Sequence, residues 1–302
     1  MGPHAHPAQF SRSDEGKKPV HFLNATSATA RLVWTSAGPG RNLAAIIARP
    51  TFDIDGDRLV FTPERPWPAG PEPVETAWGA FPPDSPEPRD GIDVFVLGSV
   101  WQPRGLPSTE LTLAIHVGAS LQRRIAVIGD RTWVRQDGVL VPGEPRQFVS
   151  MPLTCQNAYG GRGAPNPLGK GFYASEAEAL GQPLPNLEDL DSRIRHFADR
   201  PDPVRTGPSP HGGSMTIAPE RAPLPGTIVE ITHATPQGAL CFALPDFRMH
   251  ACVELEDRDL LLPLHLQAIA VFLETRRVFL AYRAEFECGG WGHRAELRMA
   301  GA

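Results

Sequence analysis

The chain has 302 residues, of which 41% are hydrophobic and 21% charged, with a formal net charge of −5 at pH 7. This is enough apolar material for one sizeable core. No run of basic residues stands out, so nucleic acid is not an expected partner. The longest apolar run, Ala268–Leu273, is far too short to span a membrane, so no membrane association is expected either.

The composition favours β structure, because 33 Pro and 29 Gly punctuate the whole chain. Helices cannot run long under that load, whereas short strands joined by irregular loops can. We therefore expect a mainly β fold of antiparallel, sandwich-like or barrel-like sheets built from hairpins, with a long irregular central region and one or two short helices. Residues 21–288 are predicted to form a single large domain, or two lobes, 21–153 and 226–288, joined by the loop region 154–225.

The two ends of the chain show no strand pattern. Residues 1–20 lack the apolar segment of a signal peptide and are rich in His, Pro, Ser and Gly, so we expect a disordered arm on a cytoplasmic protein. The four cysteines show no CxxC spacing, which favours free thiols in a reducing compartment. Residues 289–302 are expected to form a frayed tail.

The first strands are predicted to pair as two hairpins. One turns at Gly38-Pro39-Gly40, between an alternating strand at 30–34 and a continuous apolar strand at 43–48 that suits burial on both faces. The other turns at Asp55-Gly56, because both residues tolerate positive φ. Residues 63–88 are too rich in Pro for a sheet interior.

The clearest hairpin lies at the centre of the chain. Residues 111–117 alternate, the small residues Gly118-Ala119-Ser120 turn the chain, and a return strand runs from Arg124 to Ile128. Period-2 alternation on both sides of a short turn is the strongest local sign of a hairpin with one buried face.

Charged residues bracket this central hairpin. Asp90 and Asp93 precede it, and Asp130 and Arg131 follow it. Carboxylates beside arginines at strand ends usually fix loop geometry through charge-assisted hydrogen bonds, and we prefer that interpretation to catalysis. Trp133 is interpreted first as a packed core edge and second as a recognition platform.

A long irregular region follows, from Cys155 to Pro225. One short helix is predicted at 175–180, where Ser175 can cap and Glu178 lies three residues further on, and a second is a candidate at 189–197. Loops of this length are usually functional or mobile, which makes the region our leading candidate for a partner surface.

Strands resume after Gly226. The alternating segments 240–244 and 247–253 are predicted to form a hairpin turning at Pro245-Asp246. Residues 266–273 and 278–286 are predicted to form another, with the charged tip 274–277.

The first of these two hairpins would create one candidate metal site. Cys241 would lie opposite His250, with Cys252 diagonal to it. Thiolate and imidazole ligands suit zinc, but zinc needs four ligands and nothing in the sequence places a fourth. The preferred interpretation is a half-buried face of small residues with no metal. No nucleotide-binding loop, nucleophile elbow or HExxH motif occurs, so no cofactor and no catalytic residue is predicted.

Short motifs also follow one another in a recognisable order from about His21 to Phe286. They are His21–Thr26, Pro50–Ile54, Gly91–Val94, Gly129–Trp133, Phe148–Leu153, Tyr159–Gly161, Asn166–Phe172, Leu184–Asp189, Arg200–Pro203, Pro236–Pro245 and Arg277–Ala284. Each is weak alone, but the colinear set resembles bacterial proteins of the domain-of-unknown-function family 2169.

This resemblance implies an accessory adaptor or chaperone of the type VI secretion system, which helps to load cargo onto the spike. The family brings no catalytic or cofactor-binding residue. It singles out these motif or partner-surface candidates: Asp93, Gly129, Asp130, Arg131, Trp133, Asn166, Pro167, Gly169, Asn186, Glu188 and Asp189. Family members carry a longer segment after the Gly-Pro that matches Gly207-Pro208, whereas here Ser209–Leu224 is a short bridge. If the longer segment contacts cargo in relatives, the partner or its binding mode is expected to differ here.

We therefore expect a cytoplasmic, non-enzymatic adaptor for a secreted effector or a spike-tip protein. Binding would use exposed sheet edges or the 155–225 loops. A β-sandwich enzyme or carbohydrate-binding module, with a site at the ends of the central hairpin, is the alternative from another class. A structural component of the secretion particle is a third possibility. The sequence leaves the cargo and the oligomeric state open.

Overall fold

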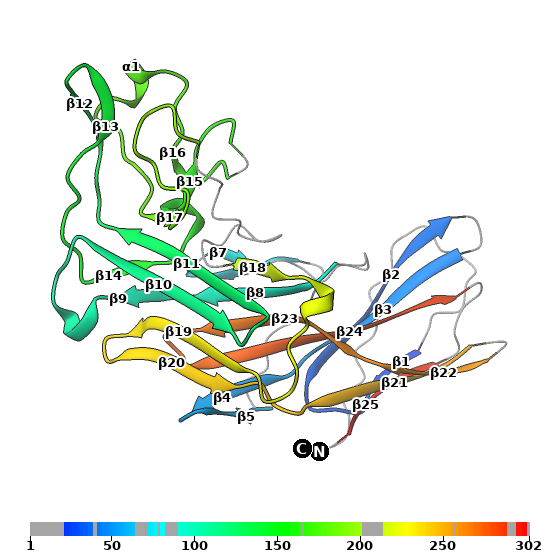
Figure 1. The fold of residues 1–302 in the computed structure, drawn as a ribbon. Helices are drawn as coiled ribbons and strands as arrows, with labels where there is room; N and C mark the ends of the chain where they lie inside the picture. The colour runs from blue at the N-terminus through cyan, green and yellow to red at the C-terminus, as the bar shows by residue number, and fades with distance from the viewer. Residues whose placement is uncertain are drawn as a thin grey trace.

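The computed structural model describes residues 21–38, 41–63, 70, 72–77, 79–81, 90–164, 166–200, 214–255, 258–288 and 294–300. Over these residues the protein is mainly β, as predicted, with several largely antiparallel sheets and a single α-helix (Figure 1). The arm expected at 1–20 lies outside the described residues. No helix in the described ranges has both the length and the apolar character needed to cross a membrane.

The largest sheet has eight strands, in the order β18-β8-β23-β24-β3-β2, with β4 paired to β24 and β5 paired to β4. Among the described strands of this sheet, only β8 and β23 run parallel to each other. The predicted hairpins β2–β3, β4–β5 and β23–β24 are confirmed. The strands are β2 (Thr29–Gly38), β3 (Arg41–Arg49), β4 (Thr51–Asp55), β5 (Arg58–Phe61), β8 (Ile92–Leu97), β18 (Ser214–Ile217), β23 (His265–Phe272) and β24 (Arg277–Cys288).

The middle strands of this sheet are buried on both faces, which explains their continuous apolar sequences. All six residues of β8 are buried, and alternate residues face two different clusters. Val94 and Val96 belong to the main core, whereas Phe95 and Leu97 pack with Phe272 on the opposite face.

A five-stranded sheet, ordered β17-β11-β10-β19-β20, shares the main core with the eight-stranded one. It contains the predicted central hairpin, β10–β11, whose register runs from Glu110 opposite Ile128 to Val117 opposite Leu121. Core residues come from facing sheets, so the predicted sandwich-like packing is confirmed. The strands are β10 (Glu110–Val117), β11 (Leu121–Ile128), β17 (Leu187–Asp189), β19 (Ile228–Thr235) and β20 (Gly238–Ala243).

A third sheet, ordered β1-β25-β21-β22, lies at the lower right of Figure 1. Its strands are β1 (His21–Asn24), β21 (Arg248–Glu254), β22 (Asp259–Pro263) and β25 (Arg294–Ala300). The frayed tail expected at 289–302 is therefore wrong over Arg294–Ala300. There Ala295 and Leu297 are fully buried between β1 and β21, and their burial holds the strand in place.

The hairpin predicted at 240–253 is also wrong. Strand β20 pairs with β19, and the turn between them is closed by Gly238, whose N–H donates to Thr235 Oγ1 at 3.2 Å. Strand β21 instead pairs with β22 and β25 in the third sheet. Phe247 holds the crossing between the sheets, because its ring packs against Phe52 at 5.4 Å and against Phe61 at 5.8 Å.

The remaining elements are short. The pairs are β6 (Val74–Thr76) with β7 (Gly79–Phe81), β9 (Ser99–Trp101) with β14 (Ser150–Pro152), β12 (Trp133–Gln136) with β13 (Val139–Pro142), and β15 (Tyr159–Gly160) with β16 (Lys170–Gly171). The helix α1 (Glu176–Ala179) forms where predicted, and Ser175 caps it by accepting from the N–H of Glu178. In the part of the chain that the structure describes, three 3-10 turns occur, at Pro103–Gly105, Cys155–Asn157 and Pro219–Arg221.

Candidate functional site

One part of the molecule projects from the sheets and holds most of the predicted site residues. It comprises residues 129–146 and 155–200, which we call the lobe, and it rises from the end of the β10–β11 hairpin (Figure 1). The chain enters the lobe at Gly129 and leaves it at Arg146. A Cβ atom on Gly129 would overlap with the main-chain carbonyl of Arg146, so only glycine fits at this crossing.

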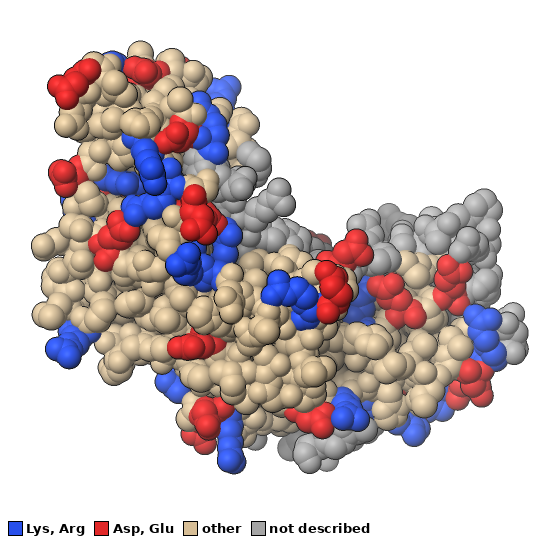
Figure 2. Space-filling view, in the orientation of Figure 1, with Lys and Arg blue, Asp and Glu red and all other residues tan. Residues whose placement is uncertain are grey.

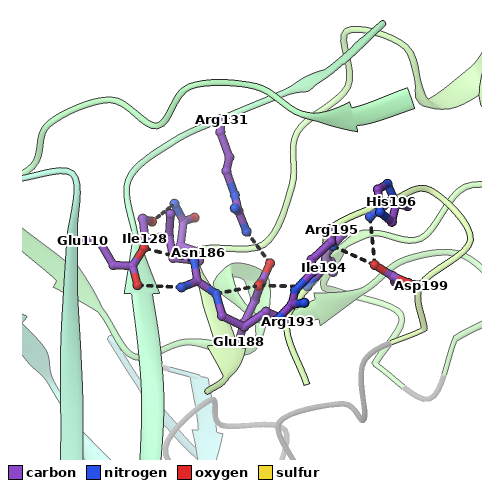
Figure 3. A network of polar contacts seen from close by, with 10 residues as sticks. All are labelled: Glu110, Ile128, Arg131, Asn186, Glu188, Arg193, Ile194, Arg195, His196 and Asp199. Atoms are coloured by element: carbon purple, nitrogen blue, oxygen red, sulfur yellow. Dashed lines mark hydrogen bonds and ion pairs between the residues drawn. The ribbon is translucent and has the colours of Figure 1, made fainter. Parts of the chain in front are cut away.

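A buried ion pair between Arg131 and Glu188 forms the centre of the lobe's base (Figure 3). Arg131 Nη2 donates to Glu188 Oε1, and the two side chains are 6% and 0% exposed. The second carboxylate oxygen, Oε2, accepts from the N–H of Ile194 at 3.2 Å and lies 3.7 Å from Arg193 Nε. One carboxylate thus ties separate segments of the lobe together.

Burial shifts the pKa of both partners. Loss of hydration raises the pKa of Glu188 above its ordinary value, and the positive charge of Arg131 opposes that rise. Loss of hydration likewise lowers the pKa of Arg131, and Glu188 opposes the fall. Removal of one partner from such a pair leaves an uncompensated buried charge, so the geometry of the lobe depends on both.

Two further ion pairs fasten the lobe to the central hairpin. Arg193 binds Glu110 at the start of β10 with both terminal nitrogens, at 2.7 and 3.0 Å. Arg123 of β11 lies 2.6 Å from the carboxylate of Asp189. The two-pronged contact of Arg193 with Glu110 fixes orientation as well as distance, and the Arg123–Asp189 pair adds a second attachment of the lobe to the sheet.

Asn186 completes this base. Its Nδ2 donates to the carbonyl of Ile128 at 2.8 Å and to Asp130 Oδ1 at 3.1 Å. The structure therefore brings six of the predicted residues together where the lobe meets the sheet. These are Gly129, Asp130, Arg131, Asn186, Glu188 and Asp189.

The same contacts explain why the second helix predicted at 189–197 is absent from the structure. Asp189 starts this segment as the last residue of β17, and its carboxylate accepts from the N–H of Asp191 at 2.8 Å. The N–H of Ile194 is taken by Glu188, and the N–H groups of Arg195 and His196 by Asp199. Carboxylates thus satisfy the main-chain donors that a helix would pair with its own carbonyls.

Trp133 lies in a small separate core inside the lobe and is only 2% exposed. Its ring meets Phe197 edge to face at 5.7 Å. The first interpretation of Trp133, a packed core residue, is the one that its burial supports.

The other predicted residues serve different parts of the structure. Asn166 Nδ2 donates to the carbonyls of Cys155 and Tyr159 at 2.8 and 3.2 Å, and so closes a loop whose tip includes the exposed Pro167. Gly169 lies so close to Gly160 that a Cβ would collide with the main chain there. Asp93 lies outside the lobe, on β8, where its carboxylate accepts from Thr216 Oγ1 at 2.9 Å.

The β12–β13 hairpin at the outer end of the lobe was not predicted from the sequence. It turns at Asp137-Gly138, both at positive φ, and Trp133 and Leu140 anchor its inner face. Val134, opposite Val141, and Val139 lie on its outer face, with Val134 38% and Val139 49% exposed. Asp-Gly between alternating segments was the available signal. We call this outer surface the valine face.

Charges of both signs are interspersed around the lobe. Figure 2 shows Lys and Arg side chains gathered on the lobe and at its junction with the sheets, with Asp and Glu side chains among them. This face therefore presents no continuous field of one sign.

The three candidate metal ligands are separated. Cys241 lies on β20 opposite Glu230, whereas His250 and Cys252 lie on β21 in another sheet. Among the described residues, no three His, Cys, Asp or Glu side chains are grouped so that they could hold a metal ion. The proposed arrangement depended on the hairpin that the structure corrects.

Fold and lobe together define a mainly β protein with a projecting, internally braced lobe. The chain belongs to the family described as "Uncharacterized protein conserved in bacteria (DUF2169)", whose model matches residues 39–219, more than half of its length. The matched segment includes the whole lobe. Comparison with curated proteins found no match, and comparison with solved structures found none either.

Proposed function

We propose that this protein is a non-enzymatic, cytoplasmic adaptor that holds an effector or a spike-tip protein of the type VI secretion system before delivery. Family membership supports the resemblance from which that partner class was inferred. The observation that carries the proposal is the valine face, an apolar surface exposed at the end of a braced lobe.

The valine face has the properties of a binding surface rather than of an unfilled core. Its hairpin is fixed from behind by Trp133 and Leu140, and its main chain is tied to the lobe, since the N–H of Phe197 donates to the carbonyl of Leu140 at 3.1 Å. Full burial of a fully exposed valine side chain contributes about 1.5–3 kcal/mol. Val134 and Val139 are 38% and 49% exposed, so each would gain up to about half of that. A surface that is already ordered loses little conformational entropy on binding, so more of that gain appears as affinity.

The carboxylates at the end of the central hairpin favour the adaptor over the enzyme or carbohydrate-binding alternative. Glu188 and Asp189 are bound to Arg131 and Arg123, so their charges already hold the lobe in place. A structural role in the secretion particle would differ in one observable way. The protein would then remain in purified sheath-spike assemblies, whereas an adaptor would leave before firing.

Co-purification tests the proposal. The tagged full-length chain is expected to retain the effector or the spike-tip protein encoded beside its own gene when they are co-expressed. The double variant Val134→Asp/Val139→Asp should lose that partner, because two carboxylates would be desolvated at the contact. The matched control is Val60→Asp on β5, where the native valine is 50% exposed and lies outside the lobe.

Two results would count against the proposal. Failure of the wild-type chain to retain either protein would remove the adaptor function. Equal retention by the lobe variant and the control would show that binding uses another surface. Circular dichroism of each variant verifies that the fold is kept.

A further inference from the structure

The segment 195–200 of the lobe contacts the β12–β13 hairpin from the side opposite the valine face. Phe197 makes this connection. Its N–H donates to the carbonyl of Leu140 at 3.1 Å, and its ring meets the ring of Trp133 edge to face at 5.7 Å. Leu140 and Trp133 anchor the inner face of the hairpin. The position of Phe197 therefore bears directly on how the valine face is supported.

Arg200 contacts Phe197 through both its charge and its hydrogen-bond donors. The guanidinium carbon lies 5.5 Å from the centre of the Phe197 ring, and Nη1 donates to the main-chain carbonyl of the same residue at 2.6 Å. A cation over the face of an aromatic ring is attracted by the ring's quadrupole. One side chain thus fixes both the ring and the main chain of Phe197.

Phe172 gives Arg200 a second attachment in the lobe. The guanidinium carbon lies 5.4 Å from the centre of the Phe172 ring. Phe172 follows β16, and its N–H donates to the carbonyl of Gly160 at 2.9 Å. Both phenylalanine rings pack against the small core that contains Trp133. Arg200 therefore links two segments of the lobe that other contacts already anchor.

Polar contacts give the segment 195–200 its compact shape. The carboxylate of Asp199 accepts from the N–H groups of Arg195 and His196 at 2.7 and 2.8 Å, and Nη1 of Arg200 also donates to the carbonyl of Asp199 at 3.0 Å. Arg195, His196 and Arg200 are all exposed. A segment that is held by exposed polar contacts can open locally without unfolding of the main core.

We propose that Arg200 is a positioning residue for the valine face. Acting through Phe197, it keeps the β12–β13 hairpin seated on the lobe, and the seated hairpin is the form that binds a partner. The role in binding rests on the proposed function, whereas the seating of the hairpin does not. Apparent affinity falls with the fraction of molecules whose binding surface is formed. An exposed arginine outside the valine face thus sets how strongly that face binds.

Hydrogen exchange of main-chain amides tests the seating without a partner. Arg200→Glu places a carboxylate over the negative faces of two rings, so the Phe197 amide should exchange about tenfold faster than in the wild type. The amide of Val94, a fully buried residue of β8 that pairs with strands on both sides, should exchange at the wild-type rate. The matched control is Arg162→Glu, the same change at an exposed arginine in another loop of the lobe, which should affect neither amide.

Two further measurements complete the test. Arg200→Lys keeps a cation that can lie over the rings, so it should restore most of the protection of the Phe197 amide. Partner affinity is then compared between the two charge reversals. Arg200→Glu should bind the effector or spike-tip protein encoded beside the gene several-fold more weakly than Arg162→Glu does.

Three results would overturn the proposal. Equal exchange of the Phe197 amide in Arg200→Glu and the wild type would show that Arg200 does not seat the hairpin. Equal loss of protection at Phe197 and Val94 would make Arg200 a general stabiliser of the fold. Unchanged affinity in spite of a loosened hairpin would separate Arg200 from binding. A wild-type chain that binds neither protein would instead remove the proposed function, and the exchange rates would still decide whether Arg200 seats the hairpin.

Discussion

Arg131 and Glu188 meet in the interior of the lobe although 57 residues separate them along the chain. Neither side chain has appreciable contact with water, and the same carboxylate also accepts from the N–H of Ile194. The pair therefore joins the start of the lobe to its end. If either charge were removed, the other would remain buried without its partner, which is why the pair matters for the fold.

Replacement of Arg131 by methionine should be strongly destabilising. Arg131→Met removes the main counter-charge of a fully buried carboxylate, and loss of one partner of a buried pair costs about 3–5 kcal/mol. Chemical denaturation would measure the free energy of unfolding. The control is Arg135→Ala, which breaks the exposed pair with Glu176 and should cost less than about 1 kcal/mol. Similar losses in the two variants would contradict the assignment of a buried brace.

Glu188 should also give the stability a characteristic pH dependence. Burial raises its folded-state pKa above the ordinary value of 4.5, so the folded state binds the proton more tightly than the unfolded state does. Stability contributed by Glu188 is therefore fully present below pH 4.5 and declines as pH rises through the folded-state pKa.

Comparison of the wild type with Glu188→Gln, whose side chain cannot ionise, isolates the pH-dependent contribution of Glu188 to stability. The difference in unfolding free energy, wild type minus variant, should fall as pH rises above 4.5 and then level off. A difference that rises over the same window would mean that the attraction of Arg131 outweighs the loss of hydration.

Local patterns in the sequence predicted much of the fold. The hairpins β2–β3, β4–β5, β10–β11 and β23–β24 each combine strand periodicity with turn residues that lie within a few positions of one another. The failures have a different origin. Strands β20 and β21 follow one another but join different sheets, and Phe247 packs on Phe52, nearly two hundred residues earlier. No local pattern encodes such a contact.

Only part of the candidate site could be predicted from the sequence. The family motifs contained Arg131, Asn186 and Glu188, but their mutual contacts depend on how the lobe folds back on β11. The hairpin that carries the valine face could have been predicted from Asp137-Gly138 and the valines on either side of it. Strand β25 also has an alternating pattern in the sequence. That pattern is weak because Ala295, a small residue, occupies a buried position where a large apolar residue is usual.

Glycine at position 129 should be irreplaceable for a steric reason alone. Its backbone is not at positive φ, but an added Cβ would overlap with the carbonyl of Arg146. Both main chains are held by hydrogen bonds, because the N–H of Gly129 donates to the carbonyl of Thr109 and the N–H of Arg146 donates to the carbonyl of Asp130, each at 2.9 Å. Gly129→Ala should therefore lower the melting temperature sharply, with a loss of unfolding free energy above about 3 kcal/mol.

Gly181→Ala provides the contrast. Gly181 has a φ of +78° with nothing within 4 Å of an added Cβ, so only backbone strain of about 1 kcal/mol is expected. If Gly181→Ala proved the more damaging of the two, the close crossing at Gly129 would not be a constraint in solution.

Leu297 tests whether the last described strand is part of the core. Its side chain is 0% exposed on β25, between β1 and β21. Leu297→Ala removes buried methyl groups and leaves a cavity, so the free energy of unfolding should fall by about 2–5 kcal/mol in chemical denaturation. Leu224→Ala, at a leucine that is 74% exposed, should change it by less than about 0.5 kcal/mol. Equal, small effects would mean that β25 frays in solution and that β21 has an open edge where β25 now pairs, whereas a large loss confined to Leu297 would show that the third sheet folds as one unit with the main core.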